Sequence, residues 1–433
     1  MMRRIEYPST GDVLYTGTAR CGLRVRVVPK PGFSGYYAVF ATDYGGTYRR
    51  FRYDGAEYDT PAGVAHYLEH KMFDLPNGDN ALTMLSANGA DPNAFTSSDV
   101  TAYYFHCTQR FEENLRLLIH FVSTPYFTEE TVQKEQGIIG QEIRMGEDNP
   151  VIAGYYNLLG LLYQKHPIRE KVIGTVESIA RITAETLYTC HKAFYTPGNM
   201  VLCVAGDTDP ERVMQIVDEL LPAGSAPVPE LHMQEEADLL PSATRISVAM
   251  PVSSPQFLIG AKIRSAERSP ALLRQMLTGT LAMRLLAGPS SPFFNRLYEN
   301  GLLNRRFDAD ADFSRGVGTV IISGESKDPE AVYAALLEEI KRVQDEGFDE
   351  GLFQRAKKAA IGSALREMED FDSVCVSLAL NEFEGFCFLD GPAVLADISR
   401  QECEDFIREW LLPERFAMSL VVPQQAAEEE NGQ

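Results

Sequence analysis

The chain has 433 residues, of which 45% are hydrophobic, with a formal net charge of −21 and seven cysteines. An acidic excess of this size does not suit a phosphate-binding surface, so we expect no nucleic-acid partner. The longest nearly apolar run, residues 158–163, is far too short to cross a bilayer, so we expect no membrane span. The length alone predicts two to four domains.

The first eight residues carry two arginines without an apolar segment behind them, which predicts no secretory signal. The cysteines are odd in number, scattered, and include no C-x-x-C pair, a pattern typical of reduced thiols. Together these features predict a cytoplasmic protein.

The segment His66-Tyr67-Leu68-Glu69-His70 is the most informative motif of the chain. A helix advances 100° per residue, so positions 66, 69 and 70 share one face and can reach a single ion. Neutral imidazole suits zinc, and Glu69 is spaced to act on a water molecule held by the metal. The order H-x-x-E-H is the inverzincin signature. The alternative is that both histidines are ordinary helix residues and Glu69 is a solvated neighbour.

The flanking sequence predicts the limits of this helix. Asp59-Thr60-Pro61 offers a capping hydroxyl and a proline suited to the first turn, and Pro76-Asn77-Gly78 offers a stop. The apolar spacing predicts four residues that dock the helix on a sheet, namely Val64, Leu68, Met72 and Phe73.

Two strands are predicted next, over residues 93–97 and 101–105. One interpretation is a structural hairpin with aromatic packing. Downstream, Thr128–Arg144 has the periodicity of a helix with Val132, Ile139 and Ile143 inward.

Two carboxylates of that helix, Glu135 and Glu142, lie seven residues apart and therefore on one face. Catalytic zinc usually takes three protein ligands, so a histidine pair predicts one more carboxylate or imidazole elsewhere in the chain. Paired carboxylates beside an apolar stripe are nevertheless more often solvated than functional.

His66, Glu69 and His70 are followed along the chain by Glu142, which has Glu135 one heptad before it. This set of residues and their spacing resembles the insulinase/pitrilysin family of zinc peptidases. The match is strongest to the branch similar to mitochondrial processing peptidase, as a bacterial-type single chain of two lobes. The resemblance implies a Zn²⁺ cofactor held by the two histidines and Glu142. It further implies that Glu69 is the general base and that Glu135 orients the site.

The resemblance also implies a function. The family's substrate-binding edge strand would here consist of Asn93, Ala94, Phe95 and Thr96, pairing with an extended peptide. We expect an endopeptidase that cleaves extended or unfolded peptides in a chamber between two lobes, working as a homodimer or with a homologous chain. The alternative is a non-hydrolytic subunit that grips peptides or scaffolds a paired homologue.

A diverged internal repeat supports two lobes. Residues 127–145 align without gaps on residues 348–366, and at that offset Ala356 and Ser363 replace the two carboxylates. No histidine follows His232, which excludes an imidazole site in the second copy.

A second pair of segments agrees with this repeat, because 182–204 and 398–422 both lead through a proline into an apolar strand. The repeat predicts two homologous lobes of similar fold. We expect an α+β architecture in which each lobe is a mostly antiparallel sheet covered by helices.

The expected organisation follows from the composition of the segments between and after the copies. We expect a zinc-bearing lobe over 1–222, a proline-containing linker over 223–241, a non-metal lobe over 242–425 and a disordered acidic tail over 426–433.

One feature departs from the family. Many members carry an Arg and a Tyr, seven residues apart in the second lobe, that contact the substrate backbone, whereas Leu297 and Asn304 stand at those places here. Either the contact is absent or a neighbouring residue replaces it, the choices being Arg296, Tyr298, Arg305 and Arg306.

Overall fold

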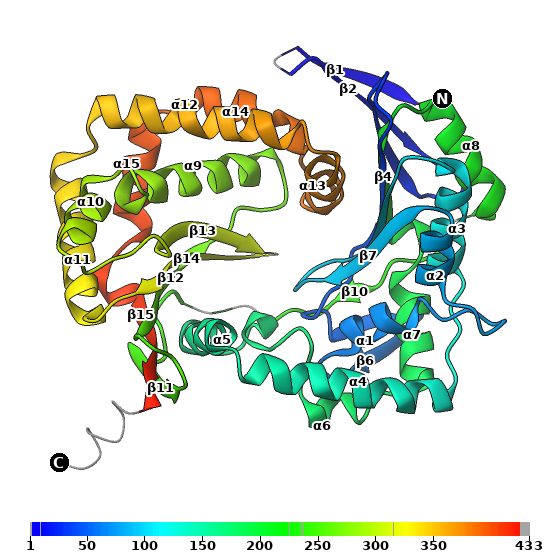
Figure 1. The fold of residues 1–433 in the computed structure, drawn as a ribbon, viewed down its shortest axis with the longest axis horizontal. Coiled ribbons are helices and arrows are strands. Elements are labelled where there is room, and N and C mark those ends of the chain that lie inside the picture. The colour runs from blue at the N-terminus through cyan, green and yellow to red at the C-terminus, as the bar shows by residue number, and fades with distance from the viewer. Residues whose placement is uncertain are drawn as a thin grey trace. The chain divides into compact units, whose positions relative to one another are not determined.

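The structure is a computed structural model, and it describes all residues except 1, 9, 225, 235, 237, 315 and 425–433. The predicted acidic tail thus lies outside the described residues. The chain is an α+β protein of two compact units, as the repeat predicted (Figure 1). Unit 1 takes its described residues from Met1–Ile143, Glu170–Met233 and Leu365–Asp390; unit 2 takes them from Arg144–Arg169, Gln234–Ala364 and Gly391–Gln433.

Unit 1 is built on a seven-stranded sheet in which all neighbours are antiparallel except the parallel pair β3 and β9. Its central strands β9 and β4 are apolar along nearly their whole length because helices cover both faces. In spatial order the strands are β1 (Arg3–Tyr7), β2 (Asp12–Thr18), β3 (Arg24–Pro29), β9 (Met200–Gly206), β4 (Tyr36–Thr42), β8 (Thr101–Cys107) and β7 (Ala90–Thr96).

One face of this sheet forms the main core of unit 1 with a group of helices. These are α1 (Val64–Lys71), α2 (Ala81–Ala87), α3 (Phe111–Ser123), α4 (Glu129–Glu147), α6 (Val176–Ile179), α7 (Ala184–Phe194) and α8 (Pro210–Leu220). The opposite face packs on α13 (Phe371–Phe383). A small sheet of β10 (Glu230–Leu231), β5 (Arg50–Tyr53) and β6 (Ala56–Asp59) completes the unit.

Unit 2 has a five-stranded sheet in the order β11 (Arg245–Met250), β15 (Phe416–Pro423), β12 (Gln256–Arg264), β14 (Val317–Glu325) and β13 (Asp308–Ser314). The helices that build the core on one face are α9 (Pro270–Ala287), α10 (Pro292–Glu299), α11 (Pro329–Glu346), α12 (Glu350–Glu367), α14 (Gly391–Asp397) and α15 (Arg400–Trp410). The other face packs on α5 (Pro150–Leu162).

The two sheets repeat one topology. In unit 1 the order β3-β9-β4-β8-β7 contains one parallel pair followed by three antiparallel pairs, and β11-β15-β12-β14-β13 in unit 2 does the same. The helices α4 and α12 begin at Glu129 and Glu350, the offset found in the sequence. The internal repeat is therefore a repeat of structure.

The units do not follow the sequential lobes expected from the sequence, because two segments are exchanged. Residues 144–169, which contain α5, belong to unit 2, and residues 365–390, which contain α13, belong to unit 1. The approach of α5 to its sheet is close: a Cβ added at Gly154 would lie 2.7 Å from Leu258 Cδ1. Hydrophobic periodicity shows that a helix is buried but not which sheet it covers.

Helix α1 is shorter than predicted at both ends. It begins at Val64 after Gly63, whose φ of 95° suits glycine, while the hydroxyl of Thr60 donates to the Arg49 carbonyl instead of capping the helix. It ends at Lys71, and residues 75–79 form a separate turn. The predicted inward residues are confirmed as buried, namely Val64, Leu68, Met72 and Phe73.

Parts of the segment predicted as a linker are hydrogen-bonded to other elements. β10 pairs with β5, and the carboxylate of Glu236 accepts the backbone N–H groups of Lys165 and His166 within unit 2. All seven cysteines are free thiols. None of the helices in the described part of the chain is long and apolar enough to cross a membrane.

Candidate metal centre and active site

Helices α1 and α4 bring together the three side chains predicted as metal ligands. Nε2 of His66 lies 3.7 Å from Glu142 Oε1, and Nε2 of His70 lies 3.7 Å from Glu142 Oε2. One ligand atom from each residue lies within 4.8 Å of the other two. Two imidazole nitrogens and a carboxylate oxygen at this separation suit one tetrahedral ion and leave a fourth position open.

His66 is held in the form that binds metal. Burial, with a smaller contribution from neighbouring His70, lowers the pKa of His66 to about 4, so its ring is neutral at physiological pH. Neutral imidazole is the ligand form. The Nδ1 atom of His66 is buried and has no hydrogen-bond partner among the described residues. No hydrogen bond from Nδ1 to a described residue therefore orients this ring.

His70 is oriented differently, by a carboxylate. Its Nδ1 lies 3.0 Å from Oε1 of Glu135, which leaves Nε2 to face Glu142. The hydrogen bond from His70 lowers the pKa of Glu135. Burial alone would lower the pKa of His70, but that bond and the nearby carboxylates raise it. Glu135 thus lies where a carboxylate fixes the tautomer of a ligating histidine.

Glu69 is not a member of this three-residue cluster and is 8% exposed. Burial raises the pKa of its carboxyl, while the Thr96 hydroxyl opposes the shift by donating a 2.7 Å hydrogen bond to Oε2. A buried carboxylate with a raised pKa beside a metal position is suited to accept a proton.

The bond from Thr96 to Glu69 was not predicted from the sequence. Thr96 faces Thr101 across the β7–β8 hairpin, with 3.3 Å between their hydroxyl oxygens, and Thr101 donates to the Tyr44 carbonyl. Two threonines that pair across a predicted hairpin are a signal that could have been found. Their contact with Glu69 depends on the tertiary fold.

The predicted substrate-binding residues lie on β7, which is the last strand of the seven-stranded sheet. Among the described strands it pairs with β8 alone, so its other edge is unpaired. Asn93 is exposed, and its Oδ1 accepts the N–H of Ala94 at 2.9 Å. Phe95 packs on the cluster around α13.

The residues considered as replacements for the family's second-lobe pair lie in unit 2. Leu297 is 3% exposed, so a buried apolar side chain fills that place. Asn304 and Arg306 both bind Glu325. Of the remaining three, Tyr298 stacks on Phe294, Arg296 lies 3.9 Å from Glu339, and Arg305 is exposed.

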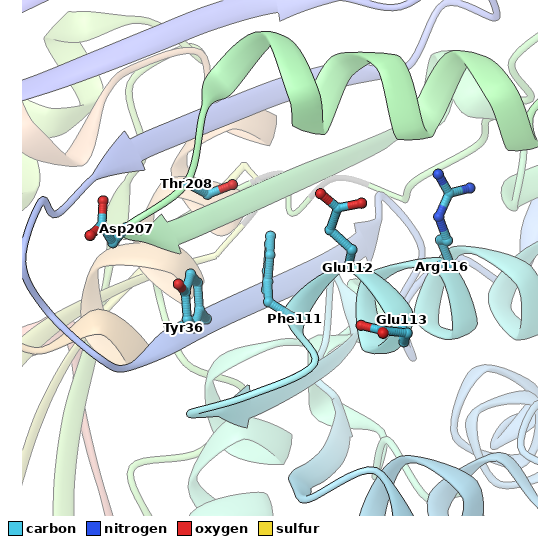
Figure 2. Close-up of a pocket in the computed structure, with 7 residues that line it drawn as sticks. All are labelled: Tyr36, Phe111, Glu112, Glu113, Arg116, Asp207 and Thr208. Carbon is cyan, nitrogen blue, oxygen red and sulfur yellow. The ribbon is translucent and has the colours of Figure 1, made fainter.

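A separate cavity of about 460 Å³ lies in unit 1 at the start of α3 (Figure 2). Figure 2 shows the ring of Phe111 beside that of Tyr36, and the two stack at 4.8 Å. Glu112 on its wall is paired with Arg212. His66, His70 and Glu142 are not among the residues that line the cavity, so it is distinct from the candidate metal centre.

Two imidazoles, a carboxylate from a second helix and a separate buried glutamate form the arrangement that the H-x-x-E-H class of peptidases uses. The chain belongs to the insulinase family of peptidases, M16. Residues 54–176 match the family described as Insulinase (Peptidase family M16), and residues 181–360 match the Peptidase M16 inactive domain.

Similar proteins cover almost the whole chain. A Bacillus subtilis protein named as an uncharacterized zinc protease, YmfH, is 36% identical over 98% of this chain and 100% of its own length. An M16-like peptidase structure from Alicyclobacillus acidocaldarius is 33% identical with a TM-score of 0.92, over 97% of this chain and 99% of that one. A Helicobacter pylori protease, 18% identical with a TM-score of 0.81 over 95% of this chain and 99% of its own, shares the fold.

Proposed function

We propose that the protein is a zinc-dependent endopeptidase acting on extended peptides. The observation that carries the proposal is the convergence of His66, His70 and Glu142 within 4.8 Å, with Glu69 buried nearby. The names of the relatives as zinc proteases support it. The lack of ligands in the second copy, where Ala356 and Ser363 stand on α12, supports a single metal centre per chain.

The side chains fit zinc. His66 and His70 would bind it through Nε2 and Glu142 through its carboxylate, with Glu135 holding the ring of His70. A zinc ion bound there supplies Lewis acidity, which acidifies a water molecule and polarises a peptide carbonyl.

In this proposal Glu69 moves the proton. Its carboxylate accepts a proton from the attacking water and passes it to the departing amine, after which it is ready for another cycle. The hydrogen bond from Thr96 holds Oε2 of Glu69 and leaves Oε1, which has no hydrogen bond from the described residues, to accept the proton. The raised pKa of Glu69 favours its function as a base near neutral pH.

The peptide would bind as an added strand on β7. Its unpaired edge ends at Thr96, whose side chain contacts Glu69, so a peptide paired with β7 would approach the base. Strand pairing uses backbone groups and selects extended chains regardless of side chain. On the resemblance alone, we also propose that the second lobe helps to enclose the peptide.

The proposal extends to the assembly and location of the protein. We propose a homodimer, or a dimer with a homologous chain, in the cytoplasm, where the seven thiols would stay reduced. Light scattering on purified protein, with and without a co-expressed homologue, tests the dimer.

The decisive experiment compares wild-type protein with Glu69→Gln for zinc content and for cleavage of an unstructured fluorogenic peptide. We expect about one zinc per chain in both, and loss of cleavage by at least about 100-fold in the variant. Two zinc ions per chain, or none after gentle purification, would contradict the metal assignment. Normal cleavage by the variant would transfer the base role to another residue, with Glu135 the first to test.

A further inference from the structure

The hydrogen-bonding pattern of β7 determines which of its backbone groups face outward. At the hairpin, the N–H of Ser97 donates to the Val100 carbonyl at 2.8 Å. Backbone pairing alternates along an antiparallel strand, so residues 91, 93 and 95 bond β8 like Ser97 does. The N–H and C=O groups of residues 90, 92, 94 and 96 therefore point to the unpaired edge.

The two central outward positions cannot donate to an incoming strand. Pro92 has no N–H, as expected for a proline on an edge strand. The N–H of Ala94 already donates to Oδ1 of Asn93, at 2.9 Å. The side chain of Asn93 thus occupies the place that a peptide carbonyl would take.

The second sheet has the same arrangement on its own edge strand. The N–H of Ala311 on β13 donates to Oδ1 of Asp310 at 2.8 Å. Asp310 lies four residues before Ser314, where the β13–β14 hairpin closes, and Asn93 lies four residues before Ser97. The feature thus recurs at the matching place of both repeats, although one residue is an amide and the other a carboxylate.

We propose that Asn93 is an internal competitor of the peptide backbone: it closes the edge of β7 in the free protein and must release Ala94 before a peptide can pair. This inference rests on the proposed function, since it concerns the strand to which the peptide is proposed to bind. Side chains that satisfy edge N–H groups also discourage unwanted pairing between chains. Every peptide must break the hydrogen bond between Asn93 and Ala94 before it pairs, which makes its binding free energy less favourable. Only a well-paired extended chain therefore displaces the Asn93 side chain.

The first test measures hydrogen exchange by mass spectrometry over residues 90–97 in full-length protein without peptide. Asn93→Ala should speed exchange in this segment, whereas Asn93→Asp, which keeps an acceptor oxygen, should not. Asp310→Ala should speed exchange over residues 308–314 only. Unchanged exchange in Asn93→Ala would show that the side chain does not protect the edge.

The second test measures affinity in a Glu69→Gln background, using a short fluorescein-labelled peptide of Lys, Ala and Phe. Removing the competitor with Asn93→Ala should tighten binding about fivefold, the value of one net hydrogen bond. Asn93→Asp should give no tightening, and Asp310→Ala is the matched control with unchanged affinity. The gain should vanish for a peptide whose backbone amides are alternately N-methylated, because such a peptide cannot pair as a strand.

The two proposals fail in different ways. A protein that cleaves peptides but whose peptide affinity is unchanged or weakened by Asn93→Ala would overturn the competitor role and leave the peptidase proposal intact. A wild-type protein that shows no zinc-dependent cleavage, yet binds peptide more tightly after Asn93→Ala, would overturn the peptidase proposal alone.

Discussion

The hydroxyl of Thr96 donates a 2.7 Å hydrogen bond to Oε2 of Glu69, which joins the last residue of an edge strand to the helix with the H-x-x-E-H motif. The contact connects the strand proposed to bind peptide with the carboxylate proposed to move the proton. A residue outside the motif thereby holds the Glu69 carboxylate in place.

The first prediction concerns this bond. Thr96→Val should lower kcat roughly tenfold, because the carboxylate of Glu69 loses the group that fixes its orientation. Zinc content should not change, since Thr96 is not a ligand. Thr96→Ser keeps the hydroxyl and should retain most of the activity. A serine variant as impaired as the valine variant would show that keeping the hydroxyl does not preserve activity, and would contradict the predicted role of this hydrogen bond.

The second prediction concerns Glu142, which α4 contributes to the proposed metal centre. Glu142→Gln should sharply reduce zinc retained after dialysis, because a charged ligand is replaced by a neutral amide. Metal analysis of the dialysed protein measures the loss. Glu147→Gln, a change on the same helix outside the metal cluster, is the control and should retain zinc. Full zinc occupancy in Glu142→Gln would remove this residue from the site.

The third prediction distinguishes Glu142, the proposed metal ligand, from Glu135, which is proposed to orient His70. Glu135→Gln should weaken zinc binding about 10- to 100-fold, less than Glu142→Gln does, because it touches His70 and not the metal position. Competition with a fluorescent zinc chelator ranks the variants. An effect of Glu135→Gln larger than that of Glu142→Gln would reverse the two roles.

The fourth prediction concerns acid stability. Burial lowers the pKa of His191 to about 4, and its Nε2 bonds the Val122 carbonyl at 3.1 Å. The unfolded chain binds this proton near pH 6.5 but the folded chain only near pH 4, so the free energy of unfolding falls as pH decreases through that window. The loss attributable to His191 should reach about 3 kcal/mol at pH 4.

Urea unfolding of zinc-free protein at several pH values measures this dependence. The His191→Phe variant keeps a ring to stack on Tyr195 and removes the titrating group, so its stability should vary less between pH 6.5 and 4. Comparing the two proteins cancels the contributions of other groups, including His66. Equal pH dependence in both would exclude His191 as a source.

Much of the candidate site could be predicted because its signals are local. The two histidines and Glu69 share a face through helical geometry alone, and Glu135 and Glu142 share another through their spacing of seven. The relation between the two helices came from the resemblance to a family and not from periodicity. The structure then places Glu142 within reach of both histidines.

The features that were missed depend on contacts distant in sequence. α1 begins after Gly63 although Thr60 and Pro61 carry the stronger local signal, and the chain there packs closely against Ile173: a Cβ at position 63 would lie 2.6 Å from that carbonyl oxygen. The bond between Asn93 and Ala94 requires knowing that β7 is at an edge, which follows only from the order of strands.

The exchange of α5 and α13 has a consequence for how the protein is made. The sheet of unit 1 is contained in the first 206 residues, but the helix on its second face begins at Phe371. A nascent chain therefore carries Val39, Cys203 and their neighbours without cover until nearly all of it has left the ribosome. Both units should reach their final packing late and together, so a chain terminated near residue 222 should aggregate instead of forming an independent lobe.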